Sequence, residues 1–275
     1  MNRRRLDRIE IASRYLLLLL GAALALLLLL TVIFFATRPS TKPPSDKGKP
    51  STVTNADGSD NTTGEPGDSV TLATTPDAGL TYQDKLIFVG DSLTAHMANR
   101  GVLTGGTATY QVWRTENNLL NLNAQVTEAK IVLPGTGEKL TIAEAAKRTK
   151  PSILVITLGT DWGVAYLNEE EFKTCYSALV EKIQAASPNT KIILQSIFPV
   201  TKDCVVPDNA KIDAANRWVK SVAAAYRCRY LDTESILKDG TGALKPEYCN
   251  SYDGIHLTTE AYVRILSYIR THAWN

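Results

Sequence analysis

Apolar and polar residues divide the chain into four parts. Residues 1–14 are short and basic, residues 15–36 carry no charge and are mostly Leu, residues 37–80 are rich in small polar residues and Pro, and residues 81–275 mix short apolar runs with helical patterns. A helix over residues 15–36 would be about 33 Å long, enough to cross a hydrocarbon core of about 30 Å. We therefore expect one transmembrane helix ahead of a single domain.

The residues that flank the apolar segment indicate an uncleaved anchor. A cleavable signal peptide has a shorter apolar region and a small-residue cleavage site, which the sequence at 33–38 does not resemble. Arg residues cluster before residue 15, and basic residues beside a span stay on the cytoplasmic side. The N-terminus is thus expected in the cytoplasm and the domain outside the cell membrane. Residues 37–80 lack the apolar side chains that a core requires, which predicts a disordered linker.

The segment 81–275 alternates strand and helix patterns. Continuous apolar strands separated by helices are typical of a parallel sheet covered on both faces. The expected fold is therefore α/β, a three-layer α/β/α sandwich with a mainly parallel sheet. The predicted strands are 85–89, 109–113, 153–158, 191–198 and 229–232, and the predicted helices are 94–100, 141–149, 168–186, 209–226 and 259–272.

The first candidate for chemistry is Ser92, in Gly90-Asp91-Ser92-Leu93 after the first strand. Ligands in such folds bind beyond the carboxyl ends of the strands. At the start of the next helix, the amide of Ser92 and the helix dipole can stabilise negative charge. The alternative is that Ser92 only caps the helix.

A candidate base for Ser92 lies in Asp253-Gly254-Ile255-His256. A serine hydroxyl is a weak nucleophile until a base takes its proton, and that base must be held in one orientation. Asp253 is close enough in sequence to hold one ring nitrogen of His256, so that the other faces the serine. An isolated Asp-x-x-His is structural more often than catalytic, whereas pairing with Ser92 in an α/β sheet favours catalysis. Of the other two histidines, His96 is expected to pack on a helix face or line the cleft, and His272 to be a solvated surface residue.

Together these motifs resemble the SGNH/GDSL family of serine hydrolases. Residues 90–93 resemble the first block of the family, residues 253–257 the last, and residues 156–161 fall at its Gly-x-Asn block. The resemblance covers residues 84–272 in the family's block order. It implies a three-layer α/β/α fold and a catalytic triad of Ser92 as nucleophile, His256 as base and Asp253 as orienting acid.

The resemblance also points to an oxyanion hole, and here the sequence departs from the family. Gly159 and Asp161 are the expected oxyanion or substrate residues of the Gly-x-Asn block. Asp161 stands where the family has an Asn that donates to the oxyanion, and an ionised carboxylate has no proton to give. Losing one such donor can cost about 10²–10³ in rate. The second block is expected within residues 113–118, where Trp113 borders the site and Asn117 or Asn118 can offer an amide. Trp113, Trp162 and Tyr166 can each stack on a sugar or acyl chain or, as aromatic residues more often do, pack in the interior.

Composition and charge limit the partners, metal sites and disulfides that we expect for this chain. The net charge of +2 and the lack of a basic run beyond the N-terminus argue against nucleic acid as a partner. The four cysteines contain no CxxC pair, so no metal site is expected. Loop positions favour a Cys204–Cys249 disulfide, with free thiols as the alternative.

Three functions fit this sequence. The first is a membrane-anchored extracytoplasmic serine esterase that removes small acyl groups, such as acetyl, from cell-envelope or extracellular carbohydrate, with no cofactor. Another small ester is the alternative substrate. The second is an O-acyltransferase of the same fold, and the third is a catalytically impaired carbohydrate-binding domain.

Overall fold

Five parallel strands form the central sheet of the protein. The computed structural model describes residues 70–250 and 253–274. The strand order is β2-β1-β5-β6-β7, and each neighbouring pair runs parallel. The expected parallel sheet is therefore confirmed. Its strands are β1 (Leu86–Gly90), β2 (Val112–Trp113), β5 (Ile153–Thr157), β6 (Lys191–Gln195) and β7 (Arg229–Leu231).

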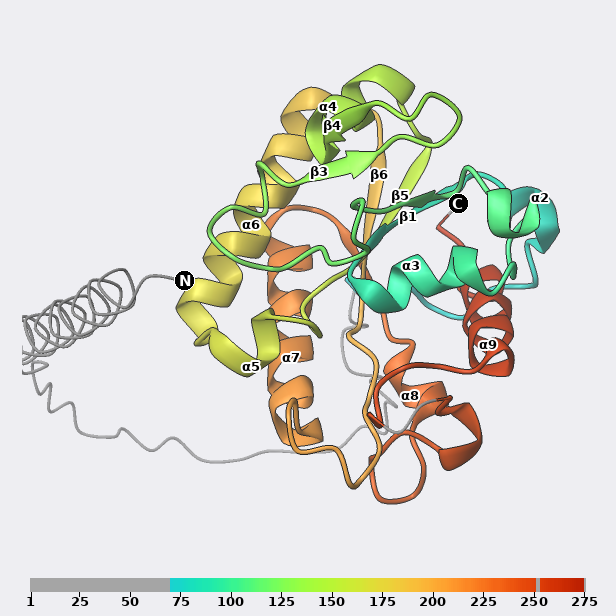
Figure 1. Ribbon diagram of the computed structural model, residues 1–275, viewed down its shortest axis with the longest axis vertical. Coiled ribbons are helices and arrows are strands. Elements are labelled where there is room, and N and C mark those ends of the chain that lie inside the picture. The colour runs from blue at the N-terminus through green and yellow to red at the C-terminus, as the bar shows by residue number, and fades with distance from the viewer. Residues whose placement is uncertain (1–69, 251–252, 275) are drawn as a thin grey trace, which may run out of the picture. The chain divides into compact units, whose positions relative to one another are not determined.

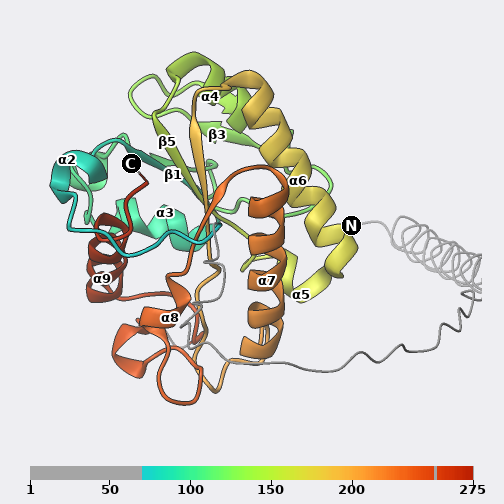
Figure 2. The same cartoon turned by 180° about the vertical axis from the view of Figure 1, so that it is seen from behind.

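Helices cover both faces of this sheet, as Figure 1 and Figure 2 show. Successive strand residues point to opposite faces, so Leu154 and Ile156 pack under α4, α6 and α7, whereas Ile153 and Val155 pack under α3 and α9. The three-layer α/β/α arrangement follows from these two apolar clusters. The longer helices are α3 (Ser92–Asn99), α4 (Ile142–Thr149), α6 (Glu169–Ala186), α7 (Asn209–Ala225) and α9 (Thr259–Arg270).

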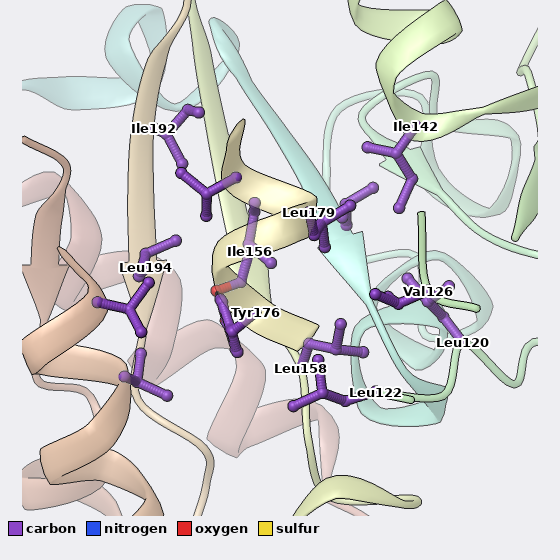
Figure 3. Close-up of a cluster of buried hydrophobic side chains, with 14 of the residues drawn as sticks. Leu120, Leu122, Val126, Ile142, Ile156, Leu158, Tyr176, Leu179, Ile192 and Leu194 are labelled. Atoms are coloured by element: carbon purple, nitrogen blue, oxygen red, sulfur yellow. Dashed lines mark hydrogen bonds between the residues drawn. The ribbon is translucent and has the colours of Figure 1, made fainter. Parts of the chain in front are cut away.

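The core beneath α6 joins the sheet to the long loop after β2 (Figure 3). Tyr176 of α6 is fully buried, and its hydroxyl donates to the carbonyl of Ile156 at 3.4 Å. From the loop, Leu120 and Leu122 add buried side chains to the same cluster. The loop that leaves β2 toward the expected site is thus held by the core.

The helices begin where the sequence provides a cap. Thr141 and Asn168 each form a capping box with the Glu three residues later, at the starts of α4 and α6. Such a box satisfies two backbone N–H groups that the first helical turn leaves without partners. Thr258 caps α9 by accepting from the amide of Ala261.

Several short elements were not predicted. They are too short to show a periodic pattern. We expected β2 to begin at Thr109, but a 3₁₀-helix precedes it and the strand begins only at Val112. These elements are α2 (Gly79–Gln83), η1 (Gly106–Ala108), the antiparallel pair β3 (Lys130–Val132) and β4 (Lys139–Thr141), α5 (Gly163–Tyr166), α8 (Glu234–Leu237) and η2 (Pro246–Tyr248).

The folded domain begins earlier than residue 81. Leu72 is buried, and its amide donates to the carbonyl of Tyr230 at 2.8 Å. The amides of Thr75 and Ala78 donate to carbonyls at the end of α9. The prediction that the linker extends to residue 80 was therefore wrong for residues 70–80, because single apolar residues and backbone hydrogen bonds tie this stretch to the sheet and to α9.

The expected anchor over residues 15–36 lies outside the described residues, as do residues 1–14 and the linker up to residue 69. Within 70–250 and 253–274, no helix is both long enough and apolar enough to cross a membrane. The transmembrane helix stays a prediction.

Candidate active site

The turn between β1 and α3 places Ser92 at the first position of the helix. Asp91 caps α3, and its side chain accepts from the amide of Leu93 at 3.2 Å. Its other oxygen accepts from the amide of Thr160 at 3.0 Å, which ties this turn to the loop after β5. Gly90 is required at the turn, because a Cβ there would lie 2.0 Å from the carbonyl oxygen of Thr157.

The loop before α9 carries the acid and the base. Gly254 has a φ of +74°, a left-handed conformation that glycine adopts without strain. This bend lets Asp253 Oδ1 accept from the amides of Ile255 at 2.8 Å and His256 at 3.2 Å. The carbonyl of Gly254 accepts from the amide of Thr201, so the loop is attached to the segment after β6.

Ser92, His256 and Asp253 come together at the carboxyl end of the sheet. Asp253 Oδ2 lies 2.6 Å from His256 Nδ1, and His256 Nε2 lies 3.3 Å from Ser92 Oγ. A proton on Nδ1 donates to the carboxylate and leaves Nε2 free to accept from the serine hydroxyl. This is the arrangement of a catalytic triad, in which the acid holds the tautomer and the base takes the proton.

Asp161 occupies the position where an oxyanion donor was expected. Its Oδ2 accepts from the amide of Ser92 at 3.0 Å, and its Oδ1 accepts from Ser92 Oγ at 3.1 Å. The amide of Ser92 is the group best placed to stabilise an oxyanion. A hydroxyl has one proton, so Ser92 Oγ donates either to Asp161 or to His256 at one time.

A second carboxyl group, Asp91, lies behind this contact. Asp91 is completely buried, and its burial, followed by the negative charge of Asp161, raises its pKa to about 7. The two amides that donate to Asp91 oppose this rise. The buried Asp91 carboxyl group therefore keeps its proton to a higher pH than an exposed aspartate does.

His96 packs against the catalytic base. The ring centroids of His96 and His256 are 4.5 Å apart with an interplanar angle of 32°. Burial, followed by the charge of His256, lowers the pKa of His96. In the described part of the chain, the buried His96 Nδ1 has no hydrogen-bond partner. A neutral His96 supports the ring of His256 without competing for Asp253, which agrees with the expectation that it packs on a helix face or lines the cleft.

Three other expected site residues contact other parts of the chain in the structure. Trp113 is only 2% exposed and lies in the core, so its expected place beside the substrate was wrong. Asn117 accepts from the hydroxyl of Thr115 and the amide of Leu119, a local turn on the surface. Gly159 has a φ of +133°, and its carbonyl accepts from the amide of Val164. Gly159 therefore shapes the turn that carries Asp161.

Sequence reasoning missed Asp91 and Thr160 as parts of the site. Asp91 precedes the serine, and a cap of the helix was a detectable role for it. Its contact with Thr160 joins residues 69 positions apart, and no local pattern indicates such a pair.

Among residues 70–250 and 253–274, no three His, Cys, Asp or Glu side chains are placed to hold one ion. Cys175, Cys204 and Cys228 are free thiols in the structure, so the Cys204–Cys249 disulfide is not formed in it.

A parallel α/β sheet with a Ser-His-Asp triad at its carboxyl end is the arrangement of a serine hydrolase. The chain belongs to the GDSL-like Lipase/Acylhydrolase family, whose model matches residues 88–264. The resemblance inferred from the sequence motifs is thus confirmed. Membership of this family supports an enzyme that hydrolyses esters.

The structure is also similar to solved structures. A GDSL-like lipase from Bacteroides thetaiotaomicron is 18% identical, with 68% of this chain and 87% of that chain covered and a TM-score of 0.47. An acetylxylan esterase from Geobacillus stearothermophilus, solved as a catalytic mutant, is 16% identical, with 69% of this chain and 94% of that chain covered and a TM-score of 0.41. The periplasmic domain of a lipopolysaccharide acetyltransferase from Salmonella Paratyphi A is 15% identical, with 68% of this chain and 81% of that chain covered and a TM-score of 0.44. No curated protein matches the chain.

Proposed function

We propose that this protein is a membrane-anchored extracytoplasmic serine esterase that removes small acyl groups, such as acetyl, from cell-envelope or extracellular carbohydrate. The observation that supports this chemistry is the catalytic triad geometry. Asp253 Oδ2 lies 2.6 Å from His256 Nδ1, and His256 Nε2 lies 3.3 Å from Ser92 Oγ. The anchor and the location rest on the apolar segment 15–36 and the basic residues before it.

The proposed reaction has two steps. Ser92 Oγ attacks the ester carbonyl carbon while its proton passes to His256 Nε2, and Asp253 stabilises the imidazolium that forms. The proton then goes to the leaving sugar oxygen as the C–O bond breaks, which leaves an acyl group on Ser92. Water, deprotonated by His256, attacks this acyl-enzyme, and His256 returns the proton to Ser92 Oγ as the C–Oγ bond breaks and the carboxylic acid leaves.

Hydrolysis of p-nitrophenyl acetate by the purified full-length chain tests this proposal. Ser92→Ala removes the nucleophile and is expected to lower kcat by at least about 10³-fold. Ser221→Ala, which removes an exposed serine hydroxyl, serves as the matched control and is expected to keep the wild-type rate. Equal rates in wild type and Ser92→Ala would refute a serine esterase, and release of nitrophenol only with a sugar acceptor present would indicate an acyltransferase.

The contact between Asp161 and Ser92 is the observation that favours the alternative, a carbohydrate-binding domain with impaired catalysis. A carboxylate that holds the Ser92 amide blocks the oxyanion position, and its negative charge repels the oxyanion. Catalysis requires Asp161 to release this amide or to carry a proton.

Asp161→Asn separates these possibilities. An asparagine amide can donate where the carboxylate repels, so we expect kcat/KM for p-nitrophenyl acetate to rise about 100-fold. Asp203→Asn, a change at an exposed carboxylate, is the control for general loss of negative charge. A lower rate in Asp161→Asn would contradict the electrostatic argument and show that the carboxyl group itself contributes to catalysis.

A further inference from the structure

Two exposed aromatic side chains closely follow Asp161, the residue whose side chain contacts Ser92. Trp162 follows Asp161 in the chain, and Asp161 contacts both the amide and the hydroxyl of Ser92. Neighbouring Cα atoms are about 3.8 Å apart, so the backbone of Trp162 lies next to that of the residue that contacts Ser92. Tyr166 stands one helical turn later, and its amide donates to the carbonyl of Trp162.

The two rings form a pair that faces water. Their centroids are 4.6 Å apart with an interplanar angle of 35°. Trp162 is 40% exposed and Tyr166 is 64% exposed. Large apolar groups that stay exposed in contact with each other, next to a site, mark a binding surface. We call Trp162 and Tyr166 the aromatic platform.

The backbone beneath the platform packs closely against the core. α5, which carries Tyr166, presses against the core, since a Cβ at Gly163 would lie 3.0 Å from the side chains of Leu122 and Phe172. Val164, between the two aromatic residues, is buried in the same cluster. The helix therefore turns Val164 inward and leaves the two rings outside, on a stretch of backbone that the core supports.

From this geometry we propose that the aromatic platform binds a sugar ring of the acylated carbohydrate and sets the preference for glycan esters. A pyranose ring covers an aromatic face with its C–H groups while its hydroxyls stay in water, which suits amphipathic side chains such as Trp and Tyr. A long acyl chain gains most from removal from water on all sides, and the platform is open. This inference rests on the proposed function, because it specifies what the same site accepts.

The test compares an ester of a sugar with an ester that has none. We would measure kcat/KM of the full-length chain for O-acetylated cello-oligosaccharide, for O-acetylated chito-oligosaccharide and for p-nitrophenyl acetate. In Trp162→Ala and in Tyr166→Ala, the ratio of oligosaccharide to p-nitrophenyl acetate is expected to fall about 5- to 10-fold. Tyr166→Phe keeps the ring and is expected to keep the ratio.

Tyr110 provides the matched control. It is also an exposed aromatic side chain, at 53%, but it precedes β2 and so lies at the amino end of the parallel sheet, away from Ser92. Tyr110→Ala is expected to leave the ratio unchanged. An unchanged ratio in both platform variants overturns the inference. As a further substrate, p-nitrophenyl octanoate tests for binding of a long acyl chain. If the platform variants lower only kcat/KM for this ester relative to p-nitrophenyl acetate, the platform binds an acyl chain and the inference is overturned.

A binding measurement keeps the inference testable if the chain hydrolyses none of these esters. Calorimetric titration with unacetylated cello-oligosaccharide and chito-oligosaccharide does not depend on turnover. The wild-type chain is expected to bind at least one of them, with a Kd about 5- to 10-fold higher in Tyr166→Ala. Absent binding, or the same Kd in both proteins, overturns the platform, whereas binding without hydrolysis refutes only the esterase.

Discussion

At the scale of single residues, the site depends on two neighbouring carboxyl groups. Asp161 reaches the serine, and Asp91 lies completely buried behind it. Burial disfavours the charged form of a carboxyl group, and a negative charge nearby disfavours it further. Burial, followed by the negative charge of Asp161, raises the pKa of Asp91 to about 7. The folded protein therefore holds a proton on Asp91 at pH values where the unfolded chain has lost it.

This difference in proton binding predicts how stability changes with pH. The pKa of Asp91 rises from 3.8 to about 7 on folding, so its contribution is fully present below about pH 4 and is lost as the pH rises through about 7. Asp91→Asn cannot titrate and still offers an oxygen to the helix amide. We expect the wild-type unfolding temperature to fall by several degrees more than that of Asp91→Asn between about pH 5 and pH 8. Parallel curves would contradict the shift.

Single residues also show where sequence reasoning ends. The motifs predicted Ser92, Asp253 and His256, and the structure brings them together. His272 was expected on the surface, but it is buried with its ring stacked on Tyr268 at 3.7 Å. The surroundings of such a side chain depend on segments that are remote in sequence, in this case the strand-like stretch before α2, whose Thr74 hydroxyl lies 3.1 Å from His272 Nε2.

At the scale of elements, the junction of β1 and α3 holds the nucleophile. The strand ends at Gly90 and the helix begins two residues later, so the chain passes close to β5. This turn has no space for a side chain at the position of Gly90. Its geometry fixes both the direction of α3 and the position of the Ser92 amide.

Gly90→Ala tests this junction. The new methyl group would lie 2.0 Å from the carbonyl oxygen of Thr157 and 2.2 Å from Thr94 Oγ1, so the backbone must shift. We expect a loss of roughly 3 kcal/mol in the free energy of unfolding, measured by denaturant titration. Gly240→Ala is the control, since a Cβ there has open space within 4 Å. Equal stability of the two variants would show that the turn adapts without cost.

Long elements were predictable and short ones were not. The predicted helices 141–149 and 168–186 match α4 and α6 nearly to the residue, because the signals that start a helix and the helical pattern lie within the elements themselves. The β3–β4 pair has three residues in each strand, and its stability comes from contacts with Arg114 and the rest of the chain. An alternation of apolar and polar residues over only three positions is too short to identify such a strand.

At the scale of the whole molecule, the parallel sheet was predicted from its buried strands, and the rule that ligands bind at carboxyl ends located the site. Ser92 follows β1 and Asp161 follows β5, which are neighbours in the sheet. The sequence could not show that Asp161 holds the Ser92 amide, because side-chain direction is decided by packing. Nor could it show the contribution of residues 70–80, whose backbone hydrogen bonds run to Tyr230 and to the end of α9.

The distance along the chain between the serine and its base has a further consequence. Asp253 and His256 are three residues apart and can meet in a short peptide, but His256 and Ser92 are 164 residues apart. Their contact needs β1, β5, β6 and the last loop to be assembled at once. A reagent that reacts only with an activated serine would thus label only correctly folded molecules. The fraction of chains labelled at Ser92 would then measure the fraction of native protein.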